Sequence, residues 1–140
     1  MHERNLMAIS EKFINLAVCG AHMTGLPLNP QLTSLGGVFV EEISTSPDYR
    51  LYKLNGFTPA RPGLLRVARD GASINLEVWR LPLQSYGAFV AGVPAPLGFG
   101  TLTLADGREV QGFLCEHYAA LNAIDISSYG GWRNYLKNAA

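Results

Sequence analysis

The first candidate for chemistry is a loop of small residues with one histidine inside it. Residues 20–25 read GAHMTG and follow the apolar run 13–19. Small residues let an anion approach backbone N–H groups, and two or three such donors can hold a carboxylate. An imidazole there can take up or release a proton, or pair with the anion when charged. A tight turn with a structural histidine has the same spacing, and it is the alternative to a carboxylate site formed by Gly20, Ala21, His22 and Met23.

Four arginines could hold such an anion, because a guanidinium is a rigid planar fork that matches a carboxylate. They are Arg50, Arg61, Arg66 and Arg80. Arg61 lies in the proline-containing segment 55–63, whereas Arg66 and Arg80 alternate with apolar residues on expected strands. An inward-pointing arginine would bind a ligand or pair with a carboxylate. A solvated surface position is the alternative for each.

Two carboxylates occur in apolar strand contexts, Glu77 in LEVW and Glu116 in FLCEHY. A carboxylate buried without a partner is costly or shifts its pKa, so each must point outward, be paired or serve a function. Most aromatic residues are expected in the core, but one phenol near the loop can bind a ligand. We include Tyr52, although the sequence does not choose among the tyrosines. The candidate catalytic residue is His22, and the candidate ligand-binding residues are Gly20, Ala21, His22, Met23, Tyr52, Arg61, Arg66 and Glu77.

Composition restricts the class of protein and of partner. The 140 residues include 11 Lys+Arg and 11 Asp+Glu, and this zero balance gives no general reason to bind nucleic acid or an anionic membrane. We see neither a transmembrane run nor a secretory signal, and expect a cytoplasmic protein. Cys19 and Cys115 are expected to be buried free thiols. Without zinc-type histidine spacing or a phosphate- or dinucleotide-binding motif, no metal or cofactor is expected.

The elements that must position these residues are short and joined by tight turns, as 15 glycines and 8 prolines suggest. Hairpin turns are expected at Asp70-Gly71 and Asp106-Gly107. Strands are expected at 13–19, 38–43, 49–54, 64–68, 73–81, 100–104 and 109–115. Helices are expected after Asn29 as the N-cap, after Pro82, and after Ser127 or Ser128.

Strands that follow one another in hairpins favour an α+β fold over a βαβ rhythm. We expect a small, mostly antiparallel β-barrel with peripheral short helices. One domain would cover residues 13–140, preceded by an N-terminal arm at residues 1–12.

Three strings occur in order along the chain: GAHMTGLPLN from residue 20, PAPLGFGT from residue 94 and GGWRNYL from residue 130. With the segments between them, from about Leu16 to Leu136, they resemble the C-terminal domain of allophanate hydrolase, an enzyme of urea and cyanuric acid catabolism. The resemblance implies a fold similar to that of γ-glutamylcyclotransferases. In cyclotransferases the carboxylate loop reads Tyr-Gly-Ser, where this sequence has Cys19-Gly20-Ala21. The stretch matching their catalytic glutamate, residues 85–93, holds no acid here, so cyclotransferase activity is disfavoured unless Glu77 or Glu116 substitutes.

The resemblance also implies a chemistry. Some members are held to decarboxylate N-carboxycarbamate, the product of their amidase domain, with a histidine of the domain as a key residue. That role falls on His22, because it lies in the matching loop. The expected ligand is then a small dianion, in the context of urea and allophanate nitrogen catabolism. The alternative is a non-catalytic accessory or assembly module for a partner amidase, and a homodimer stays open.

Overall fold

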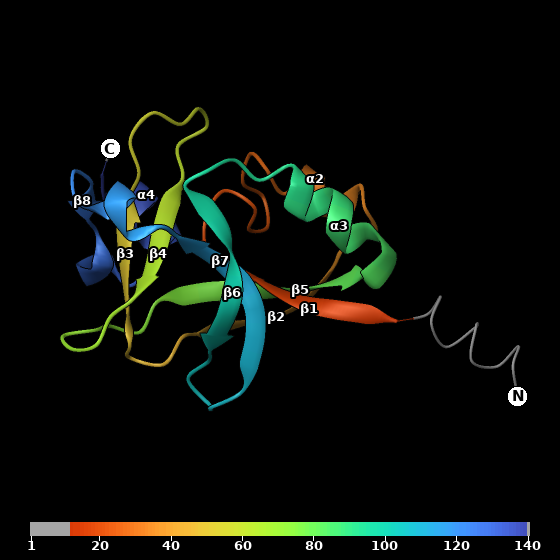
Figure 1. Ribbon diagram of the computed structural model, residues 1–140, viewed down its shortest axis with the longest axis horizontal. Helices are drawn as coiled ribbons and strands as arrows, with labels where there is room; N and C mark the ends of the chain where they lie inside the picture. Colours follow the sequence, from red (N-terminus) through yellow and green to blue (C-terminus); the bar gives the residue numbers. More distant parts are fainter. Residues whose placement is uncertain (1–11, 140) are drawn as a thin grey trace, which may run out of the picture.

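The computed structural model describes residues 12–139, so the arm expected at residues 1–12 lies almost wholly outside the described residues. Two sheets carry the fold (Figure 1). The strands are β1 Phe13–Val18, β2 Val38–Ser44, β3 Tyr49–Lys53, β4 Pro62–Arg66, β5 Asn75–Pro82, β6 Leu97–Thr103, β7 Glu109–Cys115 and β8 Ile124–Asp125. The helices are α2 Pro30–Thr33, α3 Leu83–Ala91 and α4 Trp132–Asn138, with 3-10 turns η1 His117–Ala120 and η2 Ser127–Tyr129.

The larger sheet has the order β2-β5-β1-β7-β6, with β1 at its centre. β1 pairs antiparallel with β5 and parallel with β7. Leu16, Ala17 and Val18 are all buried, as expected for a central strand covered on both faces. The chain leaves this buried strand directly into the loop at residues 20–25, so the loop starts from a fixed point in the core.

The closed barrel expected from the sequence is not confirmed. Five described strands form one sheet, and β4, β3 and β8 form a second. The edges of the larger sheet approach each other at one end only, where Ser46 N–H donates to Thr103 O and Ala105 N–H donates to Ser44 O, both at 2.9 Å. The sheet therefore curls strongly, as β-sheets with twisted strands do, while the rest of β2 has no such contact with β6 among the described residues.

The two expected hairpins have opposite outcomes. The one at Asp106-Gly107 is confirmed, because β6 and β7 pair antiparallel around Gly107, whose φ is +90°. The one at Asp70-Gly71 is wrong: β4 pairs with β3, and β5 pairs with β1 and β2. The turn is present, with Asp70 at φ +60°, but it carries the chain from one sheet to the other. Turn residues predict a reversal locally, whereas the burial of β5 on both faces requires a place inside the larger sheet.

The helices differ from expectation at their starts. Asn29 precedes α2 but makes no side-chain cap, because its amide donates to the carbonyl of His22 instead. The last helix begins at Trp132, later than expected, since Gly130 at φ +80° follows the turn of η2. Figure 1 shows α2 and α3 at one end of the molecule and α4 with β8 at the other.

Two further observations concern the core and the membrane. Cys19 and Cys115 are buried free thiols, which confirms that expectation. No helix within residues 12–139 is long and apolar enough to cross a membrane.

Candidate functional site

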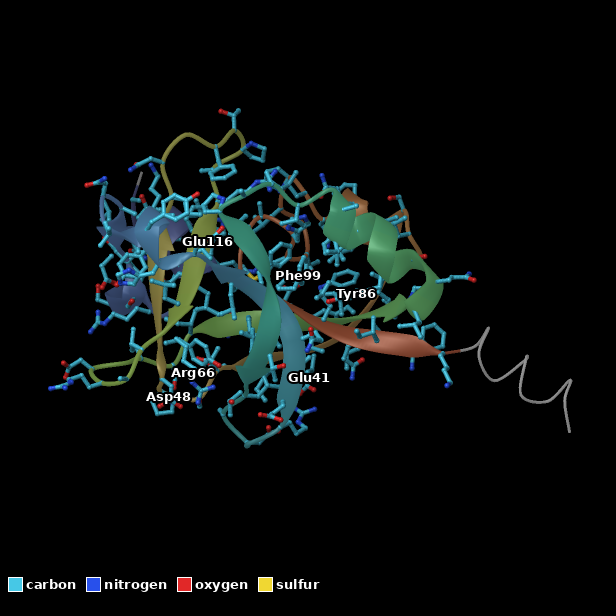
Figure 2. All side chains as sticks on the ribbon, viewed as in Figure 1. Glu41, Asp48, Arg66, Tyr86, Phe99 and Glu116 are labelled. Carbon is cyan, nitrogen blue, oxygen red and sulfur yellow. The ribbon has the colours of Figure 1, made fainter. Side chains whose placement is uncertain are left out.

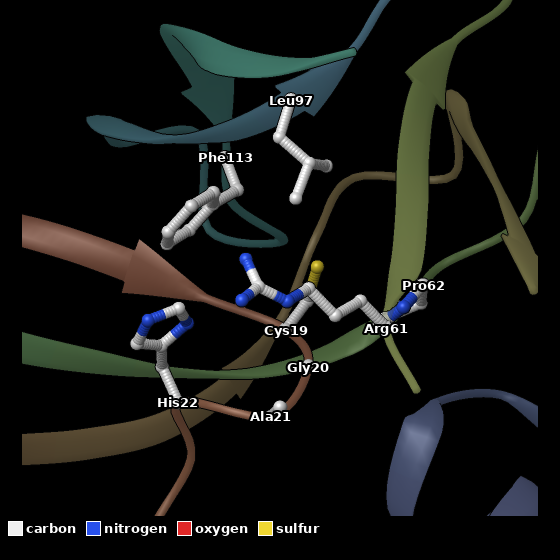
Figure 3. A pocket seen from close by; sticks show the side chains of 8 residues that line it. All are labelled: Cys19, Gly20, Ala21, His22, Arg61, Pro62, Leu97 and Phe113. Carbon is white, nitrogen blue, oxygen red and sulfur yellow. The ribbon is translucent and has the colours of Figure 1, made fainter. Parts of the chain in front are cut away.

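A pocket opens where β1 ends, and four segments distant in sequence line it (Figure 3). With its open mouth it measures about 280 Å³. Its lining combines two polar side chains with an apolar wall. The lining residues are Cys19, Gly20, Ala21, His22, Arg61, Pro62, Leu97 and Phe113.

The imidazole of His22 is held on three sides. Its Nε2 lies 2.8 Å from Oε1 of Gln31 on α2. Its ring stacks on Phe113 at 5.1 Å between centroids and meets the edge of Phe89 at 5.3 Å. Because the ring is buried, its orientation is set before any ligand arrives.

These contacts also set the charge of the histidine. Burial lowers the pKa of His22 below its ordinary value; the hydrogen bond to Gln31 opposes this, and the nearby charge of Arg61 adds to it. The ring is therefore neutral at pH 7. With an amide oxygen as its partner, Nε2 carries the proton and Nδ1 is left as an acceptor. Figure 3 shows the ring nitrogen nearer to Arg61 turned toward its guanidinium.

Arg61 brings a cation into the pocket from the loop between β3 and β4. Leu54 N–H donates to Arg61 O at 3.0 Å and closes the base of this loop. The guanidinium lies over the ring of Phe57, 5.3 Å from its centroid, and extends over Cys19 toward His22 in Figure 3. Its Nε is buried without an acceptor among residues 12–139. A buried unpaired donor costs about 1–3 kcal/mol, so its presence here points to an acceptor supplied from outside the chain.

The loop after β1 contributes backbone donors. Its turn hydrogen bonds run from Met23 N–H to Gly20 O at 3.0 Å and from Leu28 N–H to Ala21 O at 2.8 Å. They leave the N–H groups of Gly20, Ala21 and His22 without a loop acceptor in the part of the chain that the structure describes. Successive N–H groups in a turn can form a concavity that binds an anion.

Gly20 is required by a close approach. A Cβ at this position would lie 2.5 Å from Cδ of Pro62. The contact brings the loop after β1 against the residue that follows Arg61, so the absence of a side chain lets the two halves of the pocket meet.

Four of the residues expected at a ligand site do not line this pocket. Met23 is buried in the core, and Tyr52 lies on β3, opposite Gly63. Arg66 donates to Thr103 Oγ1 at 3.2 Å on an exposed face, where Figure 2 shows it beside Asp48. The carboxylate of Glu77 is occupied by protein donors, so of the three alternatives left open for it, outward, paired or functional, the structure shows the paired one. Glu116, an exposed residue that directly follows β7, donates its N–H to Pro96 O at 2.9 Å, and it too is not among the lining residues (Figure 2).

Sequence reasoning missed the residues that surround His22. Gln31 and Asn29 reach it from α2 and the turn before it, and nothing in the NPQ string marks them as partners of a histidine. Phe89, Phe99 and Phe113 form an aromatic cluster behind the ring, and Figure 2 shows Phe99 near Tyr86 of α3. The sequence predicted a helix after Pro82 and a strand at 109–115, but it could not say which polar group these two elements would enclose.

The thiol in the pocket is not a nucleophile. Burial, with a smaller effect from Cys115, raises the pKa of Cys19 to about 12. A thiol rather than a thiolate is present at pH 7, and thiols react poorly. The groups of the pocket that remain for chemistry are one guanidinium cation and one imidazole that can exchange a proton.

The arrangement of the two sheets defines the fold class. The chain is similar to a solved γ-glutamyl cyclotransferase, with a TM-score of 0.56 at 12% identity, over 81% of this chain and 70% of that one. At this identity the likeness concerns the fold alone: these are mixed sheets with few helices, in the γ-glutamylcyclotransferase-like group.

The sequence then assigns the family. The model of the allophanate hydrolase C-terminal domain matches residues 14–137, and the chain belongs to this family. A urea amidolyase of Lachancea kluyveri is 40% identical over 130 residues, which are 90% of this chain and 7% of that protein. The Kluyveromyces lactis allophanate hydrolase structure gives a TM-score of 0.88 at 38% identity, covering 92% of this chain and 22% of that one. The structure of c4763, a uropathogenic E. coli-specific protein, gives 0.85 at 39% identity, covering 91% and 98%.

Proposed function

We propose that this domain binds a small dianion in the pocket after β1 and decarboxylates N-carboxycarbamate, in the nitrogen catabolism of urea and allophanate. The observation that carries the proposal is the buried, unpaired Nε of Arg61 beside a neutral His22. The N–H groups of Gly20, Ala21 and His22, which have no loop acceptor among residues 12–139, support it, because these three residues line the same pocket. Together these groups offer donors for two carboxylates and one site for a proton.

The proposed reaction needs one proton and no cofactor. N-carboxycarbamate, ⁻OOC–NH–COO⁻, takes up H⁺ and yields carbamate, H₂N–COO⁻, and CO₂. The bond from nitrogen to one carboxylate carbon breaks, its electron pair stays on nitrogen, and the proton goes to that nitrogen. Arg61 and the backbone N–H groups hold the carboxylate that remains, while the apolar wall of Leu97 and Phe113 receives the group that loses its charge.

His22 is the proposed source of that proton. In the empty pocket the imidazole is neutral because burial and Arg61 disfavour its charge. Two negative charges from the substrate reverse this balance, so binding favours uptake of a proton at Nδ1. The bond from Nε2 to Gln31 keeps the ring oriented while Nδ1 gives the proton to the substrate nitrogen.

A coupled assay tests this proposal. An amidase that lacks this domain would generate N-carboxycarbamate from allophanate, and CO₂ release would be measured with and without the chain. The wild-type chain should accelerate CO₂ release and His22→Ala should abolish the acceleration, whereas His117→Ala should not change it, because that histidine is exposed on η1. Equal release with and without the wild-type chain would refute the catalytic proposal.

The absence of a carboxylate among the lining residues argues against a cyclotransferase. α3 carries no acid, and Glu77 and Glu116 do not line the pocket. A ligand with an α-ammonium group would therefore meet Arg61 without a compensating negative charge, which is unfavourable.

A second candidate function is a non-catalytic module that assembles with an amidase. It is favoured by the small share, 7% and 22%, that the matched segment occupies in a urea amidolyase and an allophanate hydrolase. Size-exclusion chromatography of the chain with the amidase used above separates the two candidates. A stable complex without accelerated CO₂ release supports the module, and accelerated release supports the enzyme.

A further inference from the structure

The loop that carries His22 has one end in β1 and the other at Thr24, and Thr24 is held by a single carboxylate oxygen. Its N–H donates to Glu77 Oε1 at 2.8 Å, and its hydroxyl donates to the same oxygen at 2.9 Å. Thr24 is exposed, so it lacks the packing that fixes its neighbours His22 and Met23. The position of this end of the loop therefore depends on Glu77.

The carboxylate of Glu77 is buried, hydrogen-bonded and ionised. It is 4% exposed on β5, between β2 and β1 in the larger sheet, and Trp79 Nε1 also donates to its Oε1, at 3.0 Å. Burial alone would raise the pKa of Glu77, but the hydrogen bonds from Thr24, Trp79 and Arg133 outweigh it and hold the pKa below its ordinary value. The carboxylate is therefore ionised at neutral pH and accepts from all its donors.

Arg133 joins the C-terminal helix to this arrangement. From α4 its Nη2 donates to Glu77 Oε2 at 2.9 Å and also to the carbonyl oxygen of Thr24. One guanidinium nitrogen thus contacts both the loop and the carboxylate that holds the loop. The N–H, the hydroxyl and the carbonyl of Thr24 are all engaged by two residues that do not line the pocket.

We propose that Glu77 and Arg133 form a latch that positions the His22 loop for its anionic ligand. Between the two anchored ends, the N–H groups of Gly20, Ala21 and His22 have no loop acceptor in the described part of the chain, so their directions are set by where the ends are held. Releasing Thr24 removes the anchor at one end, so the backbone of the loop can shift these donors relative to Arg61, and the contacts of the imidazole with Gln31, Phe89 and Phe113 adjust to that shift. The inference rests on the proposed function, because it names the residues that align the same anion site.

Substitutions at Arg133, one member of the latch, and at Thr24, the residue it holds, test the latch without removing a buried side chain. Arg133→Met keeps a long apolar stem on a side chain that is 35% exposed, and Thr24→Val removes only the hydroxyl contact. Lys137→Met is the matched control, since it removes a positive charge from the same helix at an exposed position. Malonate, which has CH₂ where N-carboxycarbamate has NH, is the probe. Calorimetry gives its Kd, and NMR titration gives the pKa of His22.

We expect Arg133→Met to weaken malonate binding about tenfold or more, because it removes the two hydrogen bonds by which Nη2 contacts Glu77 and Thr24. Thr24→Val should weaken it less, Arg133→Lys should restore part of it, and Lys137→Met should match wild type. The pKa of His22 should change in Arg133→Met and not in Lys137→Met, which a loss of stability alone would not produce.

The outcomes separate the two proposals. If wild type binds malonate and Arg133→Met binds it equally well with an unchanged His22 pKa, the latch is refuted and the anion site stands. If wild type does not bind malonate, the anion site is refuted. The His22 pKa then decides whether the latch positions the imidazole: an altered pKa in Arg133→Met retains the latch, and an unchanged one overturns it.

Discussion

Nε2 of His22 and Oε1 of Gln31 are 2.8 Å apart, and this contact decides which ring nitrogen serves the pocket. An amide oxygen only accepts, so the proton of the neutral ring lies on Nε2 and the lone pair on Nδ1. Gln31 is exposed on a four-residue helix, and yet it determines the tautomer of the buried histidine. The same contact opposes the lowering of the His22 pKa by burial and by Arg61.

The first prediction concerns the pH dependence of stability. The folded-state pKa of His22 is lowered, so the unfolded chain binds a proton at higher pH than the folded chain. The free energy of unfolding should therefore be highest above about pH 6.5, the ordinary histidine pKa, and fall as the pH drops toward the folded pKa. Gln31→Glu should raise the His22 pKa, since it places a negative charge beside the imidazole, and should reduce that fall.

NMR titration of the imidazole signals, with His22→Gln to assign the peak, checks the pKa directly. Chemical denaturation at several pH values checks the stability. A His22 pKa in Gln31→Glu at or below that of wild type would contradict the prediction.

The second prediction concerns the contact between the two halves of the pocket. Gly20→Ala should lower the free energy of unfolding by about 1–3 kcal/mol. A Cβ at this position would lie 2.5 Å from Pro62 Cδ, so the loop and the pyrrolidine ring of Pro62 would have to move apart. Gly87→Ala is the control. Gly87 is an exposed residue of α3, and nothing lies within 4 Å of the added Cβ, so this variant should raise the free energy of unfolding by up to about 1 kcal/mol.

Urea denaturation of the two variants beside wild type gives both values. Malonate affinity should also fall in Gly20→Ala, because the N–H groups of the loop move away from Arg61. Equal free energies of unfolding for Gly20→Ala and wild type would contradict the prediction, because Pro62 would then move aside without destabilising the fold.

The third prediction separates ligand binding from stability at Arg61. Removing the guanidinium removes a buried unpaired donor, so Arg61→Met should leave the free chain equally stable or up to about 1 kcal/mol more stable. The same variant should lose most of the rise in Tm that malonate causes in wild type, since a ligand stabilises only as far as it binds the folded state.

Thermal unfolding with and without millimolar malonate measures both effects. Arg66→Met is the matched control, because Arg66 lies on an exposed face away from the pocket and should leave the malonate-induced rise unchanged. A rise in Arg61→Met as large as in wild type would exclude Arg61 from the anion site.

Local patterns in the sequence predicted the elements that depend on near neighbours in the chain. The apolar run before residue 20 predicted β1, the Asp106-Gly107 pair predicted the turn between β6 and β7, and the small residues around His22 predicted a loop. Each follows from backbone preferences or side-chain alternation over a few residues. The family resemblance added the fold group, which local patterns could not reach.

The tertiary structure decided which distant groups meet. The Asp70-Gly71 turn was recognisable, but only the burial of β5 on both faces placed that strand in the other sheet. Arg61 and Arg66 are equal candidates in the sequence, and the loop closed by Leu54 brings only Arg61 into the pocket. Glu77 was identified as a carboxylate needing a partner, and its partners, Thr24 and Arg133, come from the two ends of the chain. Hydrogen bonds and charges act over a few ångströms of space, and sequence spacing does not encode that distance.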